Sequence, residues 1–235
     1  MCRLIQPITH RIIRVLKSYR KLFITTASLS GIAACLVDSI SMFILGREIK
    51  GYSILHNAMS AMGRPNSPVD HRIDLWWVLM GILFLIFGLG IRWAFSDQKK
   101  WGMAASVLIM LYGIGEGLGS ALFPEDKGGA MHSFNGILHN LLGSVGIVSI
   151  TIFILVMAKL IPEYKKFSIV AFLIGIISIV FFLTGHFWGN PNNFFVLTKG
   201  LWQRIYVWDY YIFVIAVAIK IISDKNIGLN LNDSK

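Results

Sequence analysis

Six long apolar stretches, separated by short polar or charged segments, dominate this chain of 235 residues. They lie at about residues 22–45, 73–95, 101–122, 133–158, 167–187 and 204–222. Each is close to the length of about 20 residues that an α-helix needs to cross a bilayer. Backbone polar groups inside lipid must be hydrogen-bonded within their own segment, so single spans of this kind are helices. The sequence therefore predicts an all-α integral membrane bundle of six transmembrane helices.

The composition excludes a soluble domain. Hydrophobic residues make up 55% of the chain and charged residues 14%, whereas soluble domains carry about 25% charged residues. The net charge is +10, but the basic residues lie between the apolar stretches and form no compact patch interleaved with aromatic residues. Nucleic acid is therefore not an expected partner. The expected partner is the lipid bilayer.

The first 21 residues form a basic leader. Ile12 and Leu16 recur at helical spacing on one side of it, while Arg14 and Lys17 occupy the other side. This pattern predicts an amphipathic helix that lies against anionic lipid at the membrane surface. An orientation signal with no further role explains the same residues.

The distribution of Lys and Arg predicts the orientation of the chain. Fifteen of these residues fall on the side of the leader and seven on the opposite side. Because cytoplasmic loops carry the excess of basic residues, both termini are expected in the cytoplasm. The transmembrane domain then covers residues 22–222, and residues 223–235 form a short polar tail. The sequence does not specify an oligomeric state.

Ionisable residues gather in the halves of the spans that face the extracytoplasmic side. At 1.5 Å per residue, most of them lie about 7–11 Å below that surface. A charge inside a membrane costs about 2.5–3.5 kcal/mol on insertion scales, so such side chains face a cavity or one another. Helix–helix hydrogen bonds are the simpler explanation for a single aspartate or histidine. The predicted ligand-binding cluster consists of Asp38, Glu116, His132, His139, His186, Arg204 and Asp209.

The histidines leave the presence of a divalent metal open. His132 and His139 are seven residues apart, which places them on one helical face but about 10 Å apart along the axis. They cannot chelate one ion as an i, i+4 pair can, so a metal would need ligands from several spans. The candidate ligands are His132, His139, His186 and Glu116. The chain contains no HExxH motif and no cysteine-based zinc spacing.

A run of alternating glycines surrounds Glu116. The glycines at 113 and 117, and those at 115 and 119, form pairs in which small residues are four apart. Such pairs let a neighbouring membrane helix approach closely, so helix packing is their expected role. Four glycines also loosen the helix, which would expose backbone carbonyls to a ligand.

The longest connection, residues 46–72, carries a candidate lid over the cluster. Residues 52–63 are expected to form a short interfacial helix, which Pro65 stops. The lid residues are predicted to be His56, Asn57, Ser60 and Arg64. Arg64 and Arg204 are also suited to contact an anion such as phosphate or carboxylate. A solvated loop helix with no such role fits the same pattern.

Three motifs, in this order, resemble those of an uncharacterised prokaryotic membrane family catalogued as domain of unknown function 998. They are NAMSAMG at residues 57–63, LFPED at 122–126 followed by His132, and GLWQRI at 200–205. The resemblance covers about residues 22–222, with Met62 where leucine is expected. It implies a six-span fold in the prokaryotic plasma membrane. It implies no activity, so no catalytic residue is assigned from it.

These observations favour binding or transport of a small ligand, a lipid headgroup or an ion. The alternative is an intramembrane metal-dependent lipid hydrolase that resembles the ceramidase-like superfamily, with the histidines as ligands and Asp38 or Glu116 moving protons. That superfamily normally has seven spans and paired histidines, which this sequence lacks. A haem protein with two axial histidines and a purely structural role are further alternatives.

Overall fold

The structure is a computed structural model that describes the backbone of residues 2–127, 131–187, 190, 192–224 and 227. The side chains of residues 2–14, 186 and 187 lie outside this description, as does most of the predicted polar tail. The part of the chain that is described is helical and contains no strand. Six of its helices are long and apolar enough to cross a membrane, which confirms the predicted all-α bundle of six spans.

The long helices are α1 (Cys2–Gly46), α2 (Asp70–Ala94), α3 (Lys99–Tyr112), α5 (Phe134–Leu160), α6 (Lys165–Phe187) and α8 (Lys199–Ser223). The third span, Lys99–Leu122, consists of α3, a π-helical segment (Gly113–Gly119) and the short α4 (Ser120–Leu122). Two 3-10 helices, Met59–Gly63 and Pro162–Tyr164, and the short α7 (Phe194–Leu197) lie in the connections. The expected helix at 52–63 is therefore shorter than predicted.

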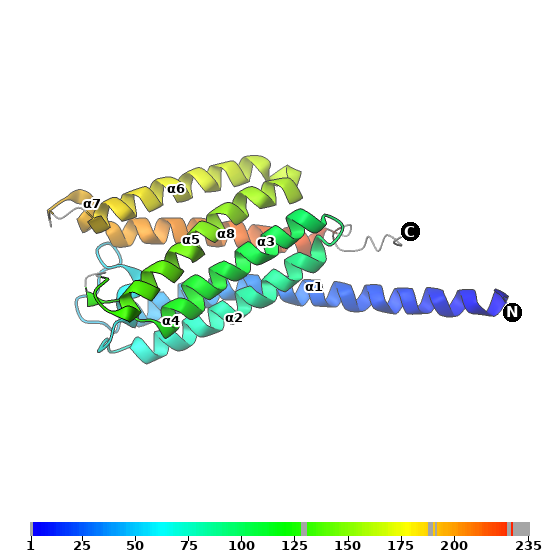
Figure 1. The fold of residues 1–235 in the computed structure, drawn as a ribbon, viewed down its shortest axis with the longest axis horizontal. Helices are drawn as coiled ribbons and strands as arrows, with labels where there is room; N and C mark the ends of the chain where they lie inside the picture. Colours follow the sequence, from blue (N-terminus) through cyan, green and yellow to red (C-terminus); the bar gives the residue numbers. More distant parts are fainter. Residues whose placement is uncertain (1, 128–130, 188–189, 191, 225–226, 228–235) are drawn as a thin grey trace.

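The six spans pack as a closed ring. Going around it, α1 contacts α2, α2 contacts α3, α3 contacts α5, α5 contacts α6, α6 contacts α8, and α8 returns to α1. The bundle in Figure 1 is elongated along the helix axes, and the N-terminal part of α1 projects beyond it. The predicted leader and the first span therefore belong to one continuous helix. The contact of the leader with anionic lipid stays a prediction.

Aromatic side chains fill one half of the ring. Phe87, Phe153 and Phe213 are fully buried there, and the rings of Phe153 and Phe213 meet edge to face with their centroids 6.4 Å apart. Protein cores of this kind are close-packed. The opposite half, toward Met59–Gly63 and α7, is where the interior opens; we call this the loop end of the bundle.

The glycine run is where three spans come together. A Cβ on Gly117 would lie 2.6 Å from the Cα of Gly81 in α2, and a Cβ on Gly115 would lie 2.3 Å from the carbonyl oxygen of Leu142 in α5. Both distances are too short for any residue larger than glycine. The predicted packing role of these glycines is thus confirmed. The π-helical turn also widens the local helix, a feature frequent at functional sites.

Candidate functional site

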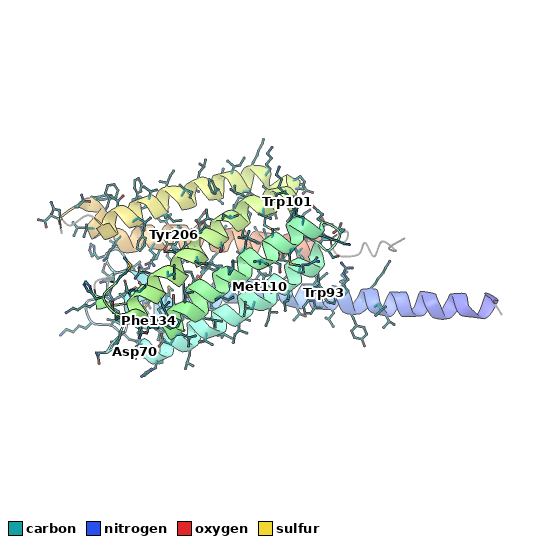
Figure 2. The ribbon with its side chains drawn as sticks, in the orientation of Figure 1. Asp70, Trp93, Trp101, Met110, Phe134 and Tyr206 are labelled. Carbon is teal, nitrogen blue, oxygen red and sulfur yellow. The ribbon has the colours of Figure 1, made fainter. Side chains whose placement is uncertain are left out.

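A cavity of about 220 Å³ lies inside the ring, at the loop end. Side chains from all six spans and from the 3-10 helix at Met59–Gly63 line it. In Figure 2, Tyr206 of α8, one of the lining residues, is labelled in the region between α5 and α6. The cavity is large enough for a ligand headgroup or a small molecule, although it is smaller than most drug-binding sites.

Asp38 of α1 forms part of the deep wall of this cavity. It lies eight residues, or about 12 Å, before the end of α1 at Gly46. Its side chain is 2% exposed. The Tyr211 hydroxyl donates a hydrogen bond of 2.6 Å to Oδ2, and the Tyr112 hydroxyl donates to the Tyr211 oxygen at 3.3 Å. Oδ1 accepts no well-aligned hydrogen bond from the described residues, and the Trp77 side chain also interacts with this carboxylate.

Glu116 lies on the π-helical segment and faces α5. A Cβ on Gly143 would lie 3.2 Å from Glu116 Oε1, and a Cβ on Gly146 would lie 3.0 Å from its Cγ. The carboxylate therefore fits over a surface of α5 that has no side chains. The side chains that the structure describes give Glu116 neither a hydrogen bond nor an ion pair. Glu116 and Asp38 both line the cavity and are close enough to interact electrostatically.

His139 of α5 brings an imidazole ring to the same cavity. Its Nδ1 lies 2.9 Å from the carbonyl oxygen of Phe123. A carbonyl oxygen only accepts, so Nδ1 must carry the proton that it donates, and in the neutral ring Nε2 is left as an acceptor. The residue thus has one nitrogen held by the connection after α4 and one available for chemistry. His139 lines the cavity together with Asp38 and Glu116.

A network centred on Arg204 holds the first connection over the loop end. The side chain is 4% exposed. Its Nη1 donates to the carbonyl oxygens of Ile54, Asn57 and Gly200 at 2.8, 2.9 and 2.8 Å. Its Nη2 donates to the Tyr52 hydroxyl at 2.6 Å. Burial raises the pKa of Tyr52 despite this positive neighbour, so the hydroxyl is neutral. Arg204 therefore fixes the backbone of the connection.

Two further contacts hold the roof. The Gln203 side-chain oxygen accepts a hydrogen bond of 2.6 Å from the backbone N–H of Met59. Arg64 Nη2 and Glu125 Oε2 form an ion pair of 2.9 Å that joins the first connection to the segment after α4. Ser60, on the 3-10 helix between these contacts, lines the cavity. The connection is a fixed roof in this structure.

The structure brings some of the predicted cluster together and separates the rest. Asp38, Glu116 and His139 line one cavity, whereas His132, Asp209 and Arg204 do not. His132 is exposed, and Asp209 Oδ2 has no hydrogen-bond partner in the described part of the chain. The side chain of His186 lies outside the described residues. No group of three or more described His, Cys, Asp or Glu side chains is arranged to hold a metal ion.

The predicted lid residues have different contacts. Ser60 reaches the cavity and Arg64 pairs with Glu125. The Asn57 side-chain oxygen accepts from the backbone N–H of Ser53, which makes a local turn. The ring of His56 contacts the carbonyl oxygen of Leu197, so it joins the first connection to α7. In this structure Ser60 is the one of the four that faces the interior.

Sequence reasoning missed the aromatic part of the site. Trp77, Tyr112, Tyr206 and Tyr211 line the cavity and are almost fully buried. The sequence does distinguish Tyr112 and Tyr211 from lipid-facing aromatic residues, because these two lie well inside their spans. Aromatic belts that face lipid lie at span ends. Trp77 is near the start of its span, where a belt residue is expected, but it is 3% exposed and points inward.

At the loop end, Asp126 caps the start of α5. Its Oδ2 accepts from the backbone N–H groups of His132 and Ser133 at 2.9 and 2.8 Å, and its Oδ1 accepts from the Ser133 hydroxyl at 2.6 Å. The Ser133 oxygen in turn accepts from the Gly136 N–H. Hydrogen bonds from Ser133, above all from its hydroxyl, lower the pKa of Asp126. These contacts fix the helix that carries His139.

Comparison with known proteins identifies the family. The sequence profile of the family described as "Protein of unknown function (DUF998)" matches residues 32–220. Since this is most of the chain, the protein belongs to that family. No curated protein and no solved structure gives a significant match.

Proposed function

We propose that this member of the DUF998 family binds a small ligand or lipid headgroup in the cavity at the loop end of its bundle. The observation that carries the proposal is the pair of carboxylates, Asp38 and Glu116, that line one cavity and have no cationic partner among the described side chains. A buried acid that lacks a partner is costly in a membrane protein and marks a functional site. Three different spans, α1, the third span and α5, place Asp38, Glu116 and His139 at this cavity.

Packing favours binding, or one stage of a transport cycle, over an open channel. The cavity is confined to the loop end, and buried side chains such as Phe87, Phe153 and Phe213 close the other half of the ring. These buried rings stand between the cavity and the far end of the bundle. Transport through this conformation would need the ring to open there. The aromatic core closes that half of the ring, and the connection held by Arg204 covers the loop end.

The lipid hydrolase alternative needs a set of metal ligands from several spans. Of the candidate ligands, Glu116 and His139 line the cavity and His132 lies on the exposed surface. The described side chains therefore offer two of the expected donors at one place. Binding through the carboxylates needs no further residue, so it is the function that the geometry supports better.

Native mass spectrometry of the purified protein tests the proposal. We expect wild-type protein, extracted gently from its own membrane, to retain a bound small molecule or lipid at one per chain. Glu116→Gln removes the charge with little change in shape, so it is expected to lose this adduct. Glu48→Gln is the control, because Glu48 forms an exposed ion pair with Arg72 away from the cavity. The absence of an adduct from all three proteins, or its retention in Glu116→Gln, would contradict the proposal.

A further inference from the structure

We infer that the cavity recognises an ammonium group carried on an apolar tail, with the ammonium beside Asp38 and Glu116 and the tail between α5 and α6. This inference rests on the proposed binding function and names the chemical class of its ligand. It follows from three independent observations: the two acids that are left without a cationic partner among the described residues, the aromatic rings around them, and the place where the cavity reaches the outer surface of the bundle.

The charges at the cavity favour a cation. Asp38 and Glu116 have no cationic partner in the described part of the chain, and the side chains that donate to Asp38, those of Tyr211 and Trp77, are not cationic. The third acid at the cavity, Glu125, is already paired with Arg64. Lys199 also lines the cavity but begins α8 at the loop end and forms no ion pair with the described residues. The deep wall therefore carries two unpaired acids, and Lys199 lies nearer the loop end.

The walls beside the two acids are aromatic. The buried rings of Trp77, Tyr112, Tyr206 and Tyr211 line the same cavity. Aromatic faces attract ammonium groups, and cages of such rings bind methylated or alkylated amines in other proteins. The Tyr211 hydroxyl donates to Asp38 Oδ2 and fixes that oxygen in position, and the Trp77 side chain interacts with the same carboxylate. The acid therefore presents its remaining acceptor capacity among aromatic rings. Acid and rings together match an organic ammonium ion better than a hydrated inorganic cation, which prefers oxygen ligands.

The cavity reaches the outer surface between α5 and α6. Ser144 and Ile147 of α5 line it from one side, and Ile179 and Leu183 of α6 line it from the other. Ser144 is exposed and Leu183 is 42% exposed, so these lining residues also lie on the outside of the bundle. Figure 1 shows that α5 and α6 meet at the Pro162–Tyr164 turn and lie apart at their other ends. An apolar tail bound to the headgroup would leave the cavity here, toward lipid.

Two sources supply this chemistry: a free alkylamine and a lipid whose headgroup is phosphoethanolamine. They share the ammonium and the tail and differ in the phosphate. Lys199, at the loop end, is the basic residue suited to contact that phosphate while the ammonium lies deeper. Replacement of Lys199 should therefore weaken binding of the phosphoethanolamine lipid and leave the simple alkylamine unaffected.

Photocrosslinking distinguishes these possibilities. The full protein in nanodiscs is irradiated with single-tailed probes that carry a diazirine in a common alkyl chain and differ in their polar ends: amine, phosphoethanolamine, hydroxyl or carboxylate. Mass spectrometry then maps the crosslinked peptides. We expect the amine or the phosphoethanolamine probe to label α5 and α6 near Ile147 and Leu183 at least about tenfold more than the hydroxyl and carboxylate probes. Glu116→Gln and Asp38→Asn should each reduce that labelling by roughly tenfold or more, since each replaces an ionised acceptor of the ammonium with a neutral one and so weakens a charge-assisted hydrogen bond.

The pattern of labelling distinguishes the two sources and tests the ammonium site. Selective labelling by the amine probe alone assigns a free alkylamine, and labelling that also depends on Lys199 assigns the lipid headgroup; both support the ammonium site. Equal labelling by the hydroxyl or carboxylate probe at this place overturns the ammonium inference and leaves ligand binding intact. If no probe labels the site and no adduct survives purification, the proposed function fails as well. Glu48→Gln controls for a general effect of acid removal, and gel filtration of every variant confirms that it is folded.

Discussion

Replacement of Arg204 should release the first connection from the bundle. In Arg204→Met the side chain keeps much of its length and loses every donor, so the carbonyl oxygens of Ile54, Asn57 and Gly200 lose their partner. Each buried group left without a hydrogen bond costs about 1–3 kcal/mol, and relaxation toward water reduces the sum. We expect a loss of about 3–5 kcal/mol in the free energy of unfolding, the range found when buried charged networks are broken.

Equilibrium unfolding in mixed micelles measures this loss, and limited proteolysis of residues 47–69 reports the release of the connection. Arg72→Met is the matched control, because Arg72 also holds the connection but through an exposed ion pair with Glu48. Such pairs contribute little in water, so this variant should unfold like wild type. A change smaller than about 1 kcal/mol in Arg204→Met, or equal changes in the two variants, would refute the idea that buried hydrogen bonds from Arg204 hold the roof.

Three further predictions concern other parts of the chain. Gly115→Ala should lower the melting temperature strongly, because the new methyl group meets the backbone of α5, whereas the methyl group of Gly143→Ala meets a side-chain oxygen and should have a small effect. Thermal scanning in detergent compares the two variants, and equal shifts in melting temperature would contradict the packing argument. Hydrogen bonds lower the pKa of Asp126 below 3.8, so its stabilising contribution is complete above pH 3.8 and is lost as the pH falls through the folded value. Thermal unfolding should show this loss in wild type and not in Asp126→Asn, and identical pH profiles would refute it. Lys50→Cys should react with a membrane-impermeant thiol reagent on intact cells; labelling only after the cells are opened would reverse the predicted orientation.

The number and placement of the spans could be predicted because hydropathy depends only on local sequence and on bilayer thickness. All six expected segments coincide with helices of the structure, and their ends differ by five residues or fewer except at the start of the first, which is continuous with the leader. The role of the glycine run could be predicted as well, because small residues four apart in a membrane helix serve mainly to let a neighbouring helix pack closely. Its two pairs face two different helices, α2 and α5, and sequence alone does not say which neighbour each pair meets.

The candidate site could be predicted only in part. Depth in the membrane placed Asp38, Glu116 and His139 at one level, and the structure brings them to one cavity. Depth carries no information about the direction in which a side chain points around the helix axis. Asp209 lies at a similar depth but not at the cavity, and Arg204 is used for the roof. The order of helices around the ring decides these outcomes, and that order depends on contacts between residues far apart in sequence.

A crystal structure of the protein, extracted from its own membrane and grown in a lipid phase, tests the central claim most directly. The account predicts ligand density in the cavity, with an atom of the ligand within hydrogen-bond distance of Asp38 Oδ1 or of the Glu116 carboxylate. A cavity filled instead by the protein's own side chains, with a lysine or arginine of this chain paired to both acids, would contradict it.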